Sequence, residues 1–165
     1  RLQGDWSSDV CSSDLDVIAL HLAEAEAAGL GLESVIEASP LVHGDPERLR
    51  RLLENLLSNA LRFSPPCGRV TVGLAQKQER ALLWVDDQGP GIPPEQRSKV
   101  FERFWQADAA RSPSNHHGLG LSIAQAIGQA HRGQLRACTA PSGGCRMVLE
   151  LPLQSRPSVR PGHAS

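Results

Sequence analysis

The sequence lacks the features that mark several large classes of protein. No uninterrupted apolar run approaches the roughly 18 residues of a membrane-spanning helix, and no secretory signal pattern opens the chain. Lysine and arginine total 17 against 18 aspartates and glutamates, so no broad basic surface suggests nucleic-acid binding. The sequence therefore predicts a cytoplasmic domain that contacts neither nucleic acid nor a membrane, although its parent protein can still be membrane-anchored.

Other absences narrow the choice of enzyme. The four cysteines lie far apart, without a Cys-x-x-Cys pair or metal-ligand spacing, so reduced structural thiols are expected. The chain has no Gly-x-x-x-x-Gly-Lys-Ser/Thr sequence and no Gly-x-Gly-x-x-Gly between a strand and a helix. A P-loop enzyme is therefore excluded.

The length of 165 residues and the apolar content of 40% predict one domain with a proper core. The first 15 residues are polar and rich in serine, and they resemble a translated sequencing adapter. We therefore set residues 1–15 aside as an artefact or a disordered end. Residues 154–165 are expected to form a disordered tail, which leaves residues 16–153 as the domain.

The chain is organised around a predicted helix that begins after Asp45-Pro46 and ends at Ser64. Aspartate suits the helix cap and proline suits the first helical position. One face of this helix has the apolar 3/4 spacing of a buried face: Leu49, Leu52, Leu53, Leu56, Leu57 and Ala60. A polar stripe runs beside it, at about 100° per residue: Arg48, Asn55, Asn59 and Arg62. This stripe is either a solvated flank or the wall of a nucleotide pocket that also holds a metal.

The other predicted elements favour an α+β fold. Helices are expected at residues 16–28 and 94–100, and a further one after Gly118, with this inward face: Leu121, Ile123, Ala124, Ile127 and Ala130. Strands are expected at residues 30–38, 69–76, 80–86, 134–139 and 145–151, with residues 41–43 as a short partner of the first. This order lacks regular βαβ alternation. It predicts a two-layer α/β sandwich, a mixed sheet covered on one face by helices.

Two glycine motifs could bind a nucleotide. In Asp87-Gln88-Gly89-Pro90-Gly91 a carboxylate follows a strand, where it can accept a hydrogen bond from an adenine amine. In Gly118-Leu119-Gly120-Leu121 glycine amides precede a helix, where they can hold phosphates. Each motif alone is weak, because glycine turns are common.

The ordered set of motifs is specific. It runs from Asn55-x-x-x-Asn59-Ala60 through Asp87-x-Gly89-x-Gly91 and Phe101-x-x-Phe104 to Gly118-x-Gly120. This set resembles the ATP-binding catalytic domain of sensor histidine kinases, in the GHKL superfamily with the gyrase and MutL ATPases. The likeness covers residues 16–152. It implies a GHKL-type fold that binds ATP and Mg²⁺.

The resemblance also implies residue roles. Asn59 would coordinate Mg²⁺, with Asn55 beside it as a second catalytic residue, and Arg62 would approach the phosphates. Asp87 would bind the adenine amine. The remaining nucleotide contacts would come from Phe63, Gly89, Gly91, Ile92, Phe104, Gly118, Leu119, Gly120 and Leu121. Phe101 and Phe104 would anchor a mobile lid over residues 106–117.

One position separates kinase from hydrolase. In the ATPase relatives a glutamate four residues before the metal-binding asparagine activates water, whereas this chain has Asn55 there. Asparagine is no base at neutral pH, and the adjacent Glu54 lies about 100° round the helix. The resemblance therefore implies transfer of the γ-phosphoryl to an external histidine, and water attack is disfavoured.

Two departures from the family pattern bear on activity. His116 stands where the family has a further glycine, and the helical hairpin that carries the phosphoacceptor histidine is missing. The implied partners are that hairpin, in a homodimeric parent, and a response-regulator receiver domain. Two alternatives stay open: a serine kinase of the anti-sigma type, and an ATP-binding module without catalysis.

Overall fold

The computed structural model describes residues 7–9, 21–106 and 118–154. Residues 21–27 are helical, and the longer helices are α2 (Pro46–Phe63) and α3 (Gly120–Ala130). The strands are β1 (Ser7–Asp9), β2 (Gly31–Ile36), β3 (Leu41–His43), β4 (Arg69–Lys77), β5 (Arg80–Asp86), β6 (Gln134–Thr139) and β7 (Cys145–Pro152). Two 3-10 turns cover Pro94–Gln96 and Lys99–Phe101.

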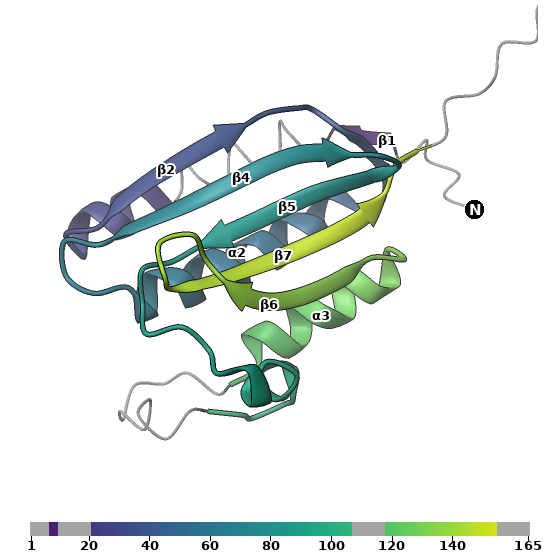
Figure 1. Cartoon of the computed structure of the whole chain (residues 1–165). Helices are drawn as coiled ribbons and strands as arrows, with labels where there is room; N and C mark the ends of the chain where they lie inside the picture. The colour runs from purple at the N-terminus through teal and green to yellow at the C-terminus, as the bar shows by residue number, and fades with distance from the viewer. Residues whose placement is uncertain (1–6, 10–20, 107–117, 155–165) are drawn as a thin grey trace, which may run out of the picture.

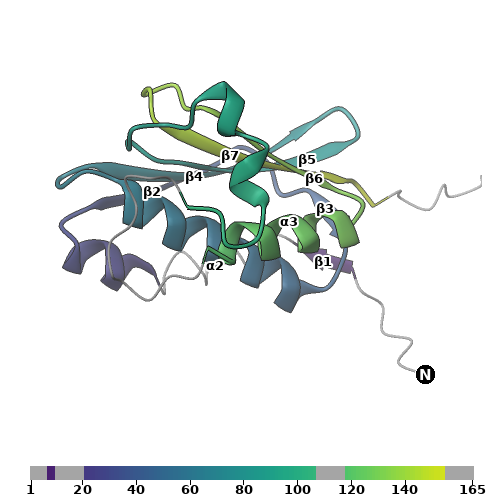
Figure 2. The ribbon, with the colours of Figure 1, turned by 90° about the horizontal axis from the view of Figure 1, so that it is seen from below.

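Five strands form one mixed sheet in the order β2-β4-β5-β7-β6 (Figure 1). β2 runs parallel to β4, and the other neighbours are antiparallel. Helices α2 and α3 lie side by side against one face of this sheet (Figure 2). The predicted α+β fold, a mixed sheet with helices on one face, is confirmed.

The core lies between α2 and the sheet because both present one apolar face. α2 begins as predicted: the Asp45 side chain accepts hydrogen bonds from the backbone of Glu47 and Arg48, and proline occupies its first turn. All six residues of the predicted apolar face are buried, and Leu61 joins them. Opposite them, alternate residues of β4, β5 and β7 point inward: Val70, Val72, Leu74, Leu83, Val85, Met147, Leu149 and Leu151.

Three details of the predicted fold are wrong. β3 pairs with β1 rather than with β2, so three residues of the segment set aside on sequence grounds form a strand. Residues 94–100 do not form one helix but two 3-10 turns, with Arg97 between them. The Arg97 side chain holds this segment by donating to the Ile92 carbonyl at 3.1 Å and to Thr139 Oγ1 at 2.9 Å. Ala130 is exposed, because it lies about 120° from Ala124 around α3. Gly128 is buried in its place.

Candidate nucleotide site

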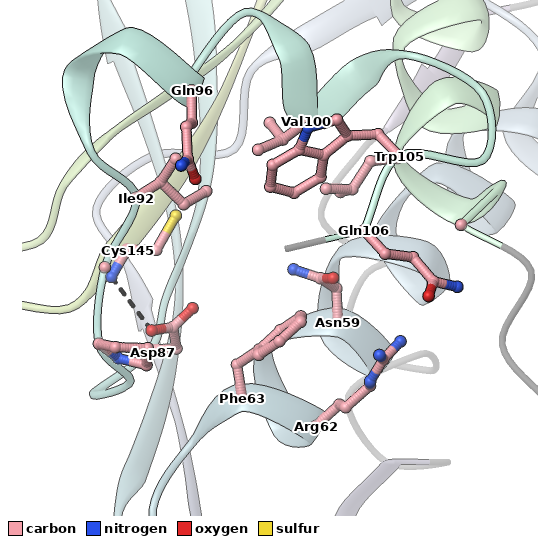
Figure 3. Close-up of a pocket in the computed structure, with 14 residues that line it drawn as sticks. Asn59, Arg62, Phe63, Asp87, Ile92, Gln96, Val100, Trp105, Gln106 and Cys145 are labelled. Atoms are coloured by element: carbon pink, nitrogen blue, oxygen red, sulfur yellow. Dashed lines mark hydrogen bonds between the residues drawn. The ribbon is translucent and has the colours of Figure 1, made fainter. Parts of the chain in front are cut away.

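One cavity of about 350 Å³ opens beside the C-terminal half of α2 (Figure 3). Its walls come from α2, the loop after β5, the segment 90–106, the start of α3 and the first residue of β7. The lining residues are Asn59, Arg62, Phe63, Asp87, Pro90, Gly91, Ile92, Gln96, Val100, Trp105, Gln106, Gly118, Leu121 and Cys145. Segments far apart in the sequence therefore converge on one space.

Asp87 is the buried acid of this cavity. It follows the last residue of β5 and is only 5% exposed. One carboxylate oxygen, Oδ1, accepts hydrogen bonds from the backbone N–H groups of Gly89 at 2.9 Å and Cys145 at 3.1 Å. Figure 3 shows the carboxylate directed toward the cavity. The fixed Oδ1 leaves Oδ2 as the acceptor for a ligand.

The surroundings of Asp87 act on its pKa in both directions. Burial raises the pKa of Asp87, and the negative charge of Asp86 adds to this increase. The two backbone hydrogen bonds oppose it, but burial prevails. Asp86 itself is held by two hydrogen bonds of 2.6 Å from the guanidinium of Arg146.

Helix α2 supplies the opposite wall. Asn59, Arg62 and Phe63 lie on adjacent turns and direct an amide, a guanidinium and a ring toward the cavity (Figure 3). The guanidinium of Arg62 lies 5.0 Å from the centre of the Phe63 ring. Arg48, the fourth member of the predicted polar stripe, is not part of this wall. It is exposed and lies 3.6 Å from the Asp45 carboxylate at the start of the helix.

Asn55 lies one turn before Asn59 and faces the start of α3. A β-carbon added to Gly120 would be 3.6 Å from Asn55 Oδ1. The Asn55 Nδ2 atom is buried and has no hydrogen-bond partner among the described residues. An unpaired buried donor costs roughly 1–3 kcal/mol, so this amide is a candidate for binding a ligand.

Glycines let backbone segments approach the acid and the helix ends. A β-carbon on Gly144 would lie 2.0 Å from the Asp87 carbonyl oxygen, and one on Gly89 would lie 2.6 Å from the Phe63 carbonyl oxygen. Gly91 and Gly118 both have positive φ angles, +75° and +65°. Glycine adopts these angles at little cost.

Most of the predicted nucleotide contacts line the cavity: Asn59, Arg62, Phe63, Asp87, Gly91, Ile92, Gly118 and Leu121. The others do not line it: Asn55, Gly89, Leu119, Gly120 and Phe104. Phe101 is buried, as expected of an anchor, whereas Phe104 is 69% exposed. Residues 107–117, including His116, lie outside the described part of the chain.

Sequence reasoning missed six lining residues: Pro90, Gln96, Val100, Trp105, Gln106 and Cys145. Cys145 had a signal, because alternation along β7 places it on the inward face with Met147 and Leu149. Burial and the nearby Asp87 raise the pKa of Cys145 to about 12. Its thiol therefore stays protonated at neutral pH.

The donor atoms of the cavity bear on which metal ion it could hold. No group of three or more His, Cys, Asp or Glu residues that could hold a metal ion occurs in residues 7–9, 21–106 and 118–154. Mg²⁺ does not need such a group, because it commonly binds through one or two protein oxygens together with substrate phosphates. The Asn59 amide oxygen fits this mode.

Within the same residues, no helix is long and apolar enough to cross a membrane.

Comparison with known sequences places the chain among sensor kinases. Residues 44–155 match the family of histidine kinase-, DNA gyrase B- and HSP90-like ATPases. Sensor histidine kinase CpxA of Escherichia coli K12 is 40% identical over 135 residues, which cover 81% of this chain and 29% of that protein. The histidine-protein kinase/phosphatase MprB of Mycolicibacterium smegmatis is 50% identical over 104 residues, covering 62% and 21%. The chain spans less than a third of these relatives.

Solved structures agree with this placement. The mycobacterial sensor histidine kinase MprB is 36% identical with a TM-score of 0.75, and the match covers 86% of this chain and 97% of that one. Full-length ShkA in complex with AMPPNP is 25% identical with a TM-score of 0.76, covering 91% and 31%. The chain therefore belongs to the family of histidine kinase-, DNA gyrase B- and HSP90-like ATPases, as an ATP-binding domain of the sensor histidine kinase type.

Proposed function

We propose that this chain is the catalytic domain of a two-component sensor histidine kinase. It binds Mg-ATP and transfers the γ-phosphoryl to a histidine on a separate dimerisation hairpin, from which a response-regulator aspartate receives it. The observation that carries this proposal is that Asn59 and Asp87 line the same cavity. An amide suited to Mg²⁺ and a carboxylate suited to an amine can therefore serve the two ends of one nucleotide.

The adenine end lies at Asp87. With Oδ1 fixed by two backbone N–H groups, Oδ2 accepts the hydrogen bond from the adenine amine. Phe63 and Ile92 give the base apolar contact, and Gly91 lets the backbone approach its plane.

The phosphate end lies between α2 and α3. Arg62 approaches the phosphates, and Asn59 would hold Mg²⁺, which when bound neutralises charge on the transferred group. No side chain among the described residues caps the start of α3. Its first N–H groups, beside Gly118 and Leu121, are therefore open to an anion. The unpaired Asn55 amide faces the same helix start and would donate to phosphate or to the incoming acceptor.

The cavity is arranged for an external acceptor. Asn55 cannot act as a base for water, and the Glu54 carboxylate lies 3.3 Å from Arg50, outside the cavity. Of the described histidines His21, His43 and His131, none lines the cavity. We propose that the acceptor histidine comes from another domain of a homodimeric parent. We place the ATP-binding domain at residues 16–153 and, because it uses ATP, in the cytoplasm.

Phosphotransfer in trans tests the proposal. A dimerisation hairpin domain of a sensor histidine kinase is mixed with the purified chain, Mg²⁺ and γ-labelled ATP. We expect an acid-labile, base-stable phosphohistidine on the hairpin, and loss of the label from it when the receiver domain is added. Hairpins with the acceptor histidine changed to glutamine should stay unlabelled. Acid-stable phosphoserine would favour a serine kinase of the anti-sigma type, and ATP binding without any transfer would favour a non-catalytic module.

A further inference from the structure

His131 joins the far ends of α2 and α3, away from the cavity. Its Nε2 atom accepts a hydrogen bond of 3.0 Å from the backbone N–H of Asp45, the cap residue of α2. Its Nδ1 atom lies 2.7 Å from the carbonyl oxygen of Ile127, in the last turn of α3. One imidazole therefore bridges the first residue of one helix and the end of the other.

These two contacts fix the chemical form of the ring. Because Nε2 accepts a hydrogen bond from the Asp45 N–H, it carries no proton of its own, and Nδ1 must then donate to the Ile127 carbonyl. His131 is thus a neutral imidazole in the Nδ1–H tautomer. An Nε2–H ring would turn a donor toward the Asp45 N–H.

Gly44, the residue before Asp45, also lies against the ring. A β-carbon at this buried residue would lie 2.5 Å from Cδ2 and 2.9 Å from Nε2 of His131. The backbone and the imidazole are in close contact, so the ring has little room to move. Any side chain at Gly44 would push it away from Asp45.

The helices approach each other again where the start of α3 meets the middle of α2. α2 and α3 run antiparallel (Figure 1), so that His131 meets Asp45 while Gly120 meets Asn55. The rise from Asp45 to Asn55 is about 15 Å and the rise from Gly120 to His131 is about 16.5 Å, at ~1.5 Å per residue. The two spans agree to within one residue, so the His131 contact sets which turn of α2 faces Gly120. A slip of one helical turn, about 5.4 Å, would separate Gly120 from Asn55.

We propose that His131, as the neutral Nδ1–H tautomer, is a positioning residue that sets the register of α3 against α2 and keeps the phosphate end of the ATP site assembled. This role rests on the proposed function, since it requires phosphates at the start of α3. The adenine end does not depend on it. Asp87 and its two hydrogen bonds belong to the sheet and its loops.

Two substitutions at His131 separate the two hydrogen bonds. In His131→Gln the side-chain oxygen can reach the position of Nε2 and accept from Asp45, whereas the shorter side chain of His131→Asn can only replace Nδ1. Gly44→Ala should displace the imidazole of His131 while leaving that residue a histidine. Exposed His43, changed to glutamine, is the matched control.

The test measures the affinity of each folded variant for Mg-ATP and for adenosine by calorimetry. His131→Asn and Gly44→Ala should lower ATP affinity roughly three- to tenfold, the size of one lost neutral hydrogen bond, and leave adenosine affinity unchanged. His131→Gln and His43→Gln should match the parent chain. An equal loss for ATP and adenosine, or no loss in His131→Asn and Gly44→Ala, would overturn the proposal.

The hydrogen bonds of His131 to Asp45 and Ile127, which we call the clasp, can be tested independently of nucleotide binding. The measurement is the nitrogen chemical shifts of the imidazole. We expect a protonated Nδ1 and an unprotonated Nε2 for His131 in the parent chain. The Nε2–H tautomer would contradict the clasp even if every variant failed to fold. If the parent chain binds no ATP while its His131 shows the expected tautomer, the proposed function fails and the clasp remains.

Discussion

Asp87 is a buried acid in the proposed adenine end of the site. It is 5% exposed and burial raises its pKa, whereas the proposed hydrogen bond from an adenine amine would be stronger to the ionised carboxylate. The N–H groups of Gly89 and Cys145 keep Oδ1 solvated by the backbone, which limits the cost. These two N–H groups stabilise the ionised carboxylate of Asp87, and a bound amine would stabilise it further.

Asp87→Asn should leave the domain at least as stable as the parent chain at neutral pH. The raised pKa means that folding is favoured while Asp87 is protonated, and that stability is lost as pH rises from the ordinary aspartate value through the raised value. Asparagine removes this loss and keeps an oxygen for Gly89 and Cys145. Thermal unfolding at several pH values checks this: the variant's advantage should disappear at acid pH. A lower melting temperature than the parent at pH 7 would contradict it.

The sequence identified residues whose chemistry is visible in a motif, and it missed those that depend on folding. Asp87 and Asn59 stand in recognisable spacings, so their roles could be predicted. Cys145 lies 58 residues after Asp87, and only strand pairing brings its backbone N–H to the carboxylate. Arg48 follows the same stripe as Asn59, but the stripe is longer than the cavity, so Arg48 lies outside it.

Periodicity predicted the long elements well. The bounds of α2 follow from its cap and from the apolar face that it buries against the sheet, and the bounds of β5 and β6 agree with the predicted strands. The short segments failed, because tertiary contacts decide them. Strand β3 and the two turns at residues 94–101 are so short that tertiary contacts outweigh the local conformational propensity of their residues.

Two phenylalanines at the end of the second turn and just after it have opposite environments. Phe101 is 7% exposed and packs in the core, whereas Phe104 is 69% exposed and has a φ angle of +63°. Phe101→Ala should lower stability by roughly 3–5 kcal/mol, the usual cost of removing a buried phenylalanine. Phe104→Gly should leave stability unchanged or raise it by about 1 kcal/mol, because glycine relieves the left-handed backbone. Chemical denaturation measures both, and a large loss in Phe104→Gly would show that its ring is packed.

The molecule assembles its cavity from residues of both layers. The sheet side contributes the acid at the end of β5 and the first residue of β7, and the helical side contributes α2 and the start of α3 (Figures 2 and 3). The nucleotide would therefore bridge the layers. Among the described residues, Asp87 is the only carboxylate that lines the cavity.

The purified chain should hydrolyse ATP no faster than the buffer background. Glu54, the acid nearest to Asn55 in sequence, is occupied by Arg50 at 3.3 Å. Glu54→Gln should accordingly leave phosphate release unchanged, in a coupled assay with and without the hairpin domain. Phosphate release that depends on Glu54 would show that the chain is built as a hydrolase.

Calorimetric titration of adenosine and Mg-ATP into the parent chain, Asp87→Asn and Asn59→Ala tests the shared cavity most directly. Asp87→Asn should weaken both ligands by roughly 1–3 kcal/mol, the cost of a lost charged hydrogen bond. Asn59→Ala should weaken Mg-ATP alone, and removing Mg²⁺ with a chelator should abolish the difference between it and the parent chain. Unchanged adenosine binding in Asp87→Asn, or unchanged Mg-ATP binding in Asn59→Ala, would contradict a single nucleotide held between these two residues.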